Sequence, residues 1–384
     1  MNSYTSFIIL LLNTLFCELT FSQLAVINPY SNVSMPIKEH NALLVSDSIY
    51  FFGGCYITCD EPTNQLVKLN VTSSFSTNQP LPLIKFTPNT PPPGFLHAAV
   101  QLSSDNKTAY LIGGVRKVKY GTPAYGDLAY SINIHTLDKW EPLIIVGQSA
   151  VKIVDETISV IDPQGDVYVH TSGNFFVIYK NLTLTMLTPK PALNLKITTC
   201  HLLNEFNIIF LGGNLAQLDV YDTQSNTWSI TKPTGVAPSE RLGHSSVITH
   251  DGRIILYGGT TNLDKLAVLQ LDPLQWIIPN VTYPLGTGAS HRDSVMVLYK
   301  DYVMITFGWI YDVAAITYFQ NILLLDIRNN SDGWNYKWMD AFVTPTTPLY
   351  TATTTVTATV KVDKKFETNA LIVKRLSKKE TITR

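Results

Sequence analysis

The 384-residue sequence is poor in charge and has no long apolar run. Only 15% of its residues are charged, 45% are hydrophobic, and the formal net charge is −1. This composition suits a folded core and excludes wholesale disorder. The near-neutral balance argues against nucleic acid as a partner. Because no stretch of 18 apolar residues occurs, we expect no transmembrane span.

Glycine motifs that bind phosphate are also missing. A Walker loop needs Gly-x-x-x-x-Gly-Lys-Ser/Thr at the start of a helix, and a dinucleotide fold needs Gly-x-Gly-x-x-Gly in the same setting. The glycine pairs of this chain instead end apolar runs and precede further short strands. We therefore interpret these pairs as structural parts of the fold.

Cysteine is scarce, with four residues in the whole chain. Cys55 and Cys59 share one predicted loop and can close a small disulfide in an oxidising compartment. Zinc is the alternative, but it usually takes four ligands and only two are local. Cys200 lies in an apolar strand, which favours a buried free thiol. We expect no metal and no cofactor.

The N-terminus resembles a secretory signal peptide. The run from Phe7 to Cys17 is a short apolar core, and the small residues Thr20 and Ser22 follow it. A signal peptide over 1–22 predicts a secreted, extracellular protein, although the usual basic start is absent. Secretion makes Asn-X-Ser/Thr sites candidates for N-glycosylation. The chain has six of them: Asn32, Asn70, Asn106, Asn181, Asn280 and Asn329.

One sequence pattern recurs along the chain at intervals of about 40 to 60 residues. Apolar runs end in glycine pairs in "SIYFFGG", "TAYLIGG", "NIIFLGG" and "RIILYGG", with weaker copies "DVYVHTSG" and "YVMITFG". Each of the six units has room for four short strands. Glycine permits close approach and unusual dihedral angles, so we assign a structural role to these residues. They are Gly53, Gly54, Gly113, Gly114, Gly212, Gly213, Gly258, Gly259 and Gly308.

Each unit also has a regular internal order. A first strand leads through a tight turn, such as Asp251-Gly252, into the apolar strand that ends in glycine. A third strand often ends in Asp, and a fourth often carries Trp. The second strand is apolar on both faces, which requires that both faces of its sheet be covered. Four-stranded sheets arranged radially meet this requirement and predict an all-β propeller.

These motifs resemble the kelch repeat. The resemblance rests on the apolar run with Gly-Gly, the later strand ending in Asp and the Trp after it, and it covers residues 37–342. It implies a kelch-type β-propeller over 23–342, similar to the central domain of galactose oxidase or to attractin- and muskelin-like propellers. Six blades of four antiparallel strands are expected, with seven as the alternative if 24–36 contributes. Residues 343–384 are Thr-rich and then basic, which indicates a disordered tail.

The resemblance also raises the alternative of a copper-radical oxidase of the galactose oxidase type. The ligand pattern of that enzyme includes a Tyr-His dipeptide, and this sequence contains none. Histidines recur where the first strands begin, at His40, His97, His244 and His291. Equivalent positions of a ring lie too far apart for one ion, so we expect each imidazole to be hydrogen-bonded within its own blade. The chain is accordingly predicted to be non-enzymatic.

The long loops after the second strands are the candidates for a binding face. Segments 55–64, 115–126 and 309–320 are rich in aromatic and basic residues, which interface hot spots favour. We expect them to bind an extracellular protein or glycan. The candidate residues, including two from connections between blades, are Arg116, Lys117, Lys119, Tyr120, Tyr125, Arg241, Arg292, Trp309, Tyr311, Tyr318 and Phe319.

Overall fold

The computed structural model describes most of the predicted propeller. The described residues are 38–56, 59, 62–116, 127–151, 156–171, 174–188, 197–260, 264–283, 291–312, 315–318, 321–328 and 336–344. The predicted signal peptide, residues 24–36 and most of the predicted tail lie outside them. No helix in these ranges is long and apolar enough to cross a membrane.

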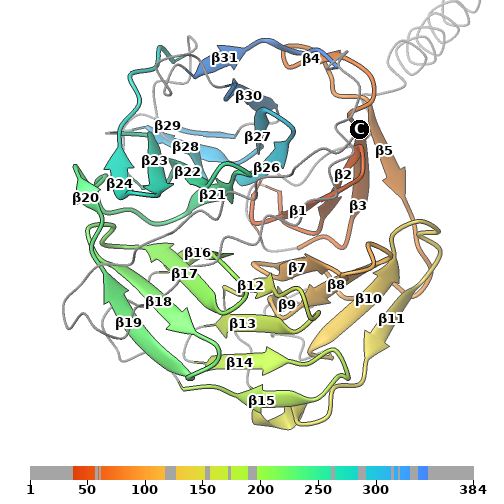
Figure 1. Ribbon diagram of the computed structural model, residues 1–384. Coiled ribbons are helices and arrows are strands. Elements are labelled where there is room, and N and C mark those ends of the chain that lie inside the picture. The colour runs from red at the N-terminus through yellow and green to blue at the C-terminus, as the bar shows by residue number, and fades with distance from the viewer. Residues whose placement is uncertain are drawn as a thin grey trace, which may run out of the picture.

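The described residues form six antiparallel four-stranded blades around a central channel (Figure 1). Blade 1 comprises β1 (Asn41–Val45), β2 (Ser48–Phe52), β3 (Leu66–Asn70) and β5 (Leu83–Phe86). Blade 2 comprises β7 (Ala99–Leu102), β8 (Thr108–Ile112), β10 (Ala129–Asn133) and β11 (Trp140–Leu143). Blade 3 comprises β12 (Ile158–Ile161), β13 (Val167–Thr171), β14 (Asn174–Ile178) and β15 (Leu184–Met186). Blade 4 comprises β16 (Ile197–Leu202), β17 (Asn207–Gly212), β18 (Leu218–Asp222) and β19 (Thr227–Thr231). Blade 5 comprises β21 (His244–Ile248), β22 (Arg253–Gly258), β23 (Leu266–Leu271) and β24 (Leu274–Ile277). Blade 6 comprises β26 (Val295–Tyr299), β27 (Tyr302–Thr306), β30 (Ile322–Asp326) and β31 (Lys337–Met339).

The strands of each blade follow one another outward from the channel in chain order. The predicted all-β propeller with six blades is confirmed, and the alternative of seven blades is wrong. Two-residue strands lie beside the blades: β20 (Thr234–Gly235) pairs in parallel with β24, and β6 (Phe95–Leu96) pairs with β9 (Val115–Arg116). A 3-10 turn, η1 (Gln148–Ala150), follows blade 2.

The second strands are buried on both faces, as β22 shows. Every residue of β22 is buried. Ile254 and Leu256 pack with blade 4, while the intervening Ile255 and Tyr257 pack with blade 6. Alternate side chains of one strand therefore enter two different cores. Apolar residues at every position, without polar alternation, are what this arrangement needs.

A glycine pair makes the contact between blades 5 and 6. Gly258 and Gly259 have φ angles of 81° and 99°, which residues other than glycine rarely adopt. A Cβ on Gly258 would lie 2.2 Å from the carbonyl oxygen of His291, and the N–H of Gly259 donates to that same oxygen at 2.8 Å. The main chains of the two blades therefore touch directly.

The interface between blades 6 and 1, the closing interface, has an aromatic side chain in place of the first glycine of the pair. Phe307 stands where other units have their first glycine, and its φ is 53°. Its ring packs against His40 and Phe51 with both centroid distances at 5.3 Å. Further out, β4 (Phe75–Ser76) pairs with β32 (Ala341–Phe342), so the end of blade 6 is tied to blade 1.

Candidate functional site

An open ring of main-chain hydrogen bonds, the channel-mouth ring, links five of the six blades at one end of the channel. Its members are the residues that lead into the inner strands of blades 5, 6, 1, 2 and 3. The N–H of Asp293 donates to Gly243 O at 3.0 Å, Glu39 to Asp293 at 3.4 Å, His97 to Glu39 at 3.4 Å and Thr157 to His97 at 2.8 Å. This chain of bonds holds the side chains at the channel mouth in fixed positions relative to one another.

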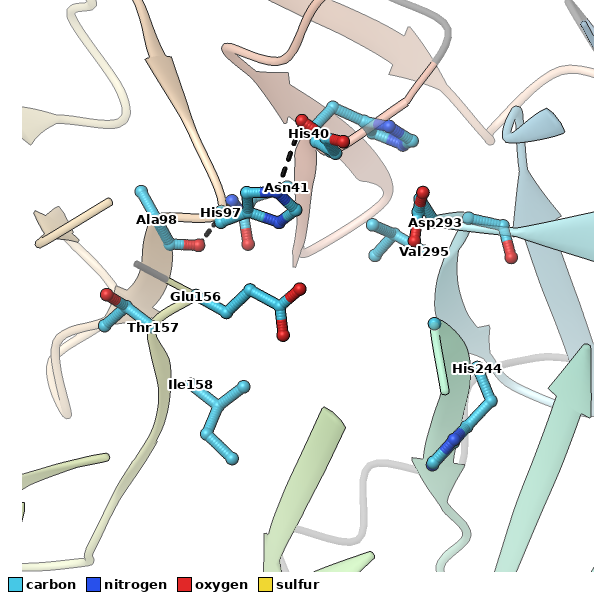
Figure 2. Close-up of a pocket in the computed structure, with 13 residues that line it drawn as sticks. His40, Asn41, His97, Ala98, Glu156, Thr157, Ile158, His244, Asp293 and Val295 are labelled. Atoms are coloured by element: carbon cyan, nitrogen blue, oxygen red, sulfur yellow. Dashed lines mark hydrogen bonds and ion pairs between the residues drawn. The ribbon is translucent and has the colours of Figure 1, made fainter. Parts of the chain in front are cut away.

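The channel mouth contains a pocket of about 150 Å³ (Figure 2). Three carboxylates line it, from Glu39, Glu156 and Asp293, together with the imidazoles of His97 and His244. None of the described residues that line the pocket is a lysine or an arginine. The pocket therefore presents acidic and imidazole groups to whatever enters it.

Glu39 is a partly buried carboxyl group of the pocket with a raised pKa. Burial raises its pKa, and the nearby charges of Asp293 and Glu156 raise it further. His97 acts in the opposite direction, because its Nε2 lies 3.3 Å from Glu39 Oε2. Lys38 also lowers the pKa, so the protonation state of Glu39 depends on four titratable neighbours.

The histidines at the first strands bond to the preceding blade, and the expectation of bonds within each blade is wrong. His40 Nε2 is 3.0 Å from Thr306 Oγ1, His244 Nε2 is 3.4 Å from Thr199 Oγ1, and His291 Nδ1 is 3.0 Å from Tyr257 Oη. Burial lowers the pKa of His40 and of His244 to about 3 and that of His291 to about 4. These neutral imidazoles help to hold the blades together.

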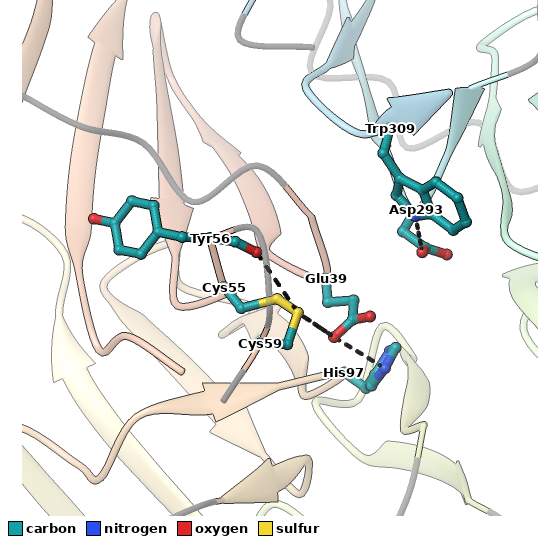
Figure 3. Close-up of a disulfide and its surroundings, with 7 residues drawn as sticks. All are labelled: Glu39, Cys55, Tyr56, Cys59, His97, Asp293 and Trp309. Carbon is teal, nitrogen blue, oxygen red and sulfur yellow. Dashed lines mark hydrogen bonds and ion pairs between the residues drawn. A yellow bond between two sulfur atoms is a disulfide. The ribbon is translucent and has the colours of Figure 1, made fainter. Parts of the chain in front are cut away.

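A disulfide joins Cys55 and Cys59 beside the channel mouth (Figure 3). Their Cα atoms are 4.9 Å apart, and Glu39 Oε2 lies 3.7 and 3.6 Å from the two sulfurs. Since a disulfide sulfur carries no proton, these are close contacts and not hydrogen bonds. Cys55 also forms a β-bridge with Lys38, in which its N–H donates to Lys38 O at 3.0 Å.

A β-hairpin rises beside the same pocket. Its strands are β28 (Trp309–Asp312) and β29 (Ala315–Tyr318), and β25 (His291–Arg292) extends it to a three-stranded sheet. Trp309 Nε1 donates to Asp293 Oδ2 at 2.6 Å (Figure 3). Two cations approach its ring, with Lys38 Nζ at 5.5 Å and the Arg292 guanidinium at 5.1 Å from the centroid. The hairpin is therefore anchored to the pocket wall.

The candidate binding residues have different placements. Arg292 and Trp309 lie together at the rim, Tyr311 and Tyr318 belong to β28 and β29, and Arg116 belongs to β9 on blade 2. The predicted candidates Lys117, Lys119, Tyr120, Tyr125 and Phe319 lie outside the described residues.

Arg241 does not lie on a surface, contrary to the prediction. Only 1% of it is exposed. Its guanidinium donates to the Asp264 carboxylate at 2.8 Å and to the main-chain oxygens of Asp264 and Gly258 at 3.0 and 3.3 Å. A buried cation needs such partners, and they leave it unavailable to a ligand. Arg241 is a structural residue of the connection between blades 4 and 5.

Sequence reasoning missed the carboxylates of the pocket. Glu39 and Asp293 each sit directly before the polar start of an inner strand, and Glu156 occupies a similar place in blade 3. Acidic residues at this recurring position are a signal that the sequence carries. Histidines close to Glu39 and Asp293 form a second recurring pattern at nearby positions.

Potential glycosylation sites fall mainly on the opposite end of the propeller. Asn70, Asn106 and Asn181 are exposed and lie at or just after the end of a first or third strand, whereas the pocket and the hairpin lie where second strands end. Antiparallel pairing puts these two sets of connections at opposite ends of the blades. Asn280 is exposed at the pocket end, and Asn32 and Asn329 lie outside the described residues.

Comparison with known proteins supports the fold. No protein-family model matches the chain, and no curated protein matches it. Among solved structures, the structure of YjhT is similar with a TM-score of 0.57 and 13% sequence identity, covering 79% of this chain and 98% of that one. The chain is thus a β-propeller in fold, and at this identity the likeness carries no statement about activity.

Proposed function

We propose that this chain is a secreted, non-enzymatic propeller of the kelch type that binds an extracellular protein or glycan through the end carrying the channel mouth. We call that end the loop face, defined by the pocket, the Cys55–Cys59 loop and the hairpin of β28 and β29. The observation that carries the proposal is the convergence of these parts. Trp309 contacts Asp293 and Lys38, and Glu39 contacts both sulfurs and His97.

The chemistry of the loop face suits recognition. An indole held between an acidic hydrogen-bond acceptor and two cations is a rigid aromatic group with little entropy left to lose on binding. The neighbouring pocket adds three carboxylates that can accept hydrogen bonds from sugar hydroxyls or from a basic side chain. Potential glycans on Asn70, Asn106 and Asn181 would cover the other end, and Asn280 is the one described acceptor at the end of the loop face.

Copper-radical oxidation is the weaker candidate. That chemistry in the galactose oxidase type needs a cysteine cross-linked to a tyrosine. Cys55 and Cys59 are bonded to each other, and Cys200 packs between blades 3 and 4. The missing Tyr-His dipeptide argues in the same direction.

The binding proposal is tested with the chain expressed in secreting cells. Extracellular proteins and glycans are screened by pull-down, and each captured ligand is titrated against two variants. Trp309→Ala should weaken binding about tenfold or more, as loss of an aromatic hot spot does. Lys139→Ala changes an exposed residue on the outer part of blade 2 and should bind as the parent chain does.

A glycan can serve as a second probe of the same face. Asp312→Asn with Ala314→Thr creates an acceptor site on the hairpin and should abolish binding when it is glycosylated. Asn181→Gln, at the opposite end, should leave the affinity unchanged. Equal binding by all these variants would contradict the loop face as the site, and an intracellular, unprocessed product would contradict secretion.

A further inference from the structure

Glu39 and the two disulfide cysteines form a cluster with metal-ligand chemistry. Their potential ligand atoms, one carboxylate oxygen and two sulfurs, all lie within 4.8 Å of one another. Among the described residues, this is the one group of three or more His, Cys, Asp or Glu side chains that meets that condition. The sulfurs are now bonded to each other, so neither can act as a thiolate ligand.

The distances in the cluster match a zinc tetrahedron apart from the sulfur–sulfur bond. Zn–S bonds of about 2.3 Å and Zn–O bonds of about 2.1 Å at tetrahedral angles place sulfur and oxygen about 3.6 Å apart. Glu39 Oε2 lies 3.7 Å from Cys55 Sγ and 3.6 Å from Cys59 Sγ. Breaking the disulfide and separating the sulfurs is therefore the main change that a metal ion would require.

The main chain holds two of the three ligands in place. Cys55 is fixed by its β-bridge to Lys38, the residue next to Glu39. Glu39 is fixed by two bonds of the channel-mouth ring, to Asp293 and from His97. His97 Nε2 also approaches the Glu39 oxygen at 3.3 Å, a contact that orients a carboxylate ligand in many metal sites.

We propose that Cys55, Cys59 and Glu39 form a redox-gated site for a thiophilic divalent cation such as Zn²⁺. A thiol reductant transfers two electrons and two protons to the disulfide, which becomes two thiols while the reductant becomes a disulfide. Zn²⁺ then binds the two thiolates and the Glu39 carboxylate and displaces the two thiol protons to solvent. His97 acts as a positioning residue for Glu39. The proposal is independent of any partner of the loop face.

Cobalt binding to the full chain tests the site, because Co²⁺ replaces Zn²⁺ and reports thiolate ligands by charge-transfer absorption. The background variant Cys17→Ser/Cys200→Ser leaves Cys55 and Cys59 as the remaining cysteines. It is examined oxidised and after reduction with dithiothreitol, which is then removed without oxygen. The reduced form should bind one Co²⁺ with thiolate absorption, and the oxidised form should show none.

Ligand variants sharpen the assignment. Glu39→Gln in the reduced background should weaken Co²⁺ binding at least about tenfold and keep the thiolate absorption. His97→Ala should weaken binding and His97→Gln, which can still donate to the carboxylate, should restore it. Melting curves of the oxidised variants establish that each one folds. Absence of thiolate absorption in the reduced background, or equal affinity for Glu39→Gln, would overturn the proposal.

Discussion

The interface between blades 5 and 6 and the closing interface between blades 6 and 1 solve the same packing problem in opposite ways. At the first, Gly258 and Gly259 bring main chain against main chain, and a Cβ on Gly258 would meet His291 O at 2.2 Å. At the second, Phe307 replaces the first glycine and fills the space with aromatic rings. The β4–β32 pair then joins the two blades at the rim.

The difference follows from the path of the chain. Blades 5 and 6 are consecutive, so their connection already restrains their relative positions. Blades 6 and 1 are far apart in sequence, and only noncovalent contacts hold them together. Buried aromatic area supplies more free energy than the contact of a glycine pair with a main-chain oxygen. We infer that the closing interface needs side chains because no peptide bond closes the ring.

The largest effect is expected from Gly258→Val at the 5–6 interface. The branched side chain would collide with His291 O and would have to adopt a φ near 81°, so stability should fall by about 3 kcal/mol or more. Gly252→Val is the matched control. Gly252 has a φ of 80° but nothing within 4 Å of its Cβ position, so backbone strain of about 1–2 kcal/mol is all it should cost. Equal chemical unfolding curves would refute close packing as the role of the pair.

Phe307→Gly gives the closing interface the Gly-Gly sequence that blade 5 has at Gly258 and Gly259. Losing the buried ring costs about 3–5 kcal/mol, and relief of its positive φ returns about 1 kcal/mol. The net loss should be about 2–4 kcal/mol in urea unfolding. An unchanged or raised stability would show that the closing interface does not depend on aromatic packing.

Acid should weaken both interfaces, because each buries a histidine with a lowered pKa. The values are about 3 for His40 and about 4 for His291, against an ordinary value of 6.5. Between pH 6.5 and these lowered pKa values, each histidine is protonated in the unfolded chain and neutral in the folded one. The free energy of unfolding is therefore at its full value above pH 6.5 and falls as the pH drops. Each histidine contributes up to about 1.4 kcal/mol per pH unit.

The measurement is the melting temperature between pH 7 and pH 4.5. His40→Phe removes the buried imidazole of the closing interface, so the melting temperature of this variant should decline less steeply with falling pH. His135→Phe, at an exposed position, should leave the slope unchanged. A slope that is the same for parent and His40→Phe would contradict the assignment.

Lys38→Met should have the smallest effect. It removes the ammonium group that contacts Trp309 across the closing interface at 5.5 Å and keeps the apolar stem. A cation–π contact at a partly exposed site is worth about 0.5–1 kcal/mol. Lys139→Met, whose ion pair with Glu141 is exposed, serves as the comparison and should change stability less. The reverse order in thermal unfolding would count against the contact.

Much of the fold could be predicted from periodic residues. Glycine pairs and doubly apolar strands repeat because each blade meets the same packing problem, so they reveal the blade number. Phe307 was visible as a missing glycine, but its partners His40 and Phe51 come from the other end of the chain. The β4–β32 pair has two-residue strands and no periodic signal. Such contacts become apparent only when the ring is closed.

The candidate site was predicted less well, for a physical reason. Trp309 and Arg292 were identified by residue type, and the structure brings them together. Arg241 is an arginine like Arg292, but it is buried, because its guanidinium pairs with the carboxylate of Asp264 in the loop between β22 and β23. Glu39 and Asp293 gather at the channel mouth through the ring of main-chain bonds. Residue type indicates what a side chain can do, whereas burial and partners depend on distant segments.

A pair of truncated chains tests most directly whether side chains and the β4–β32 pair close the ring. A chain ending at residue 344 keeps the pair, and a chain ending at residue 340 loses Phe342, which is fully buried against Phe75, Tyr299 and Tyr302. Urea unfolding should show that the shorter chain is less stable by about 3 kcal/mol or more, since buried Phe side chains are worth that much. Equal stability of the two chains would contradict this account of closure.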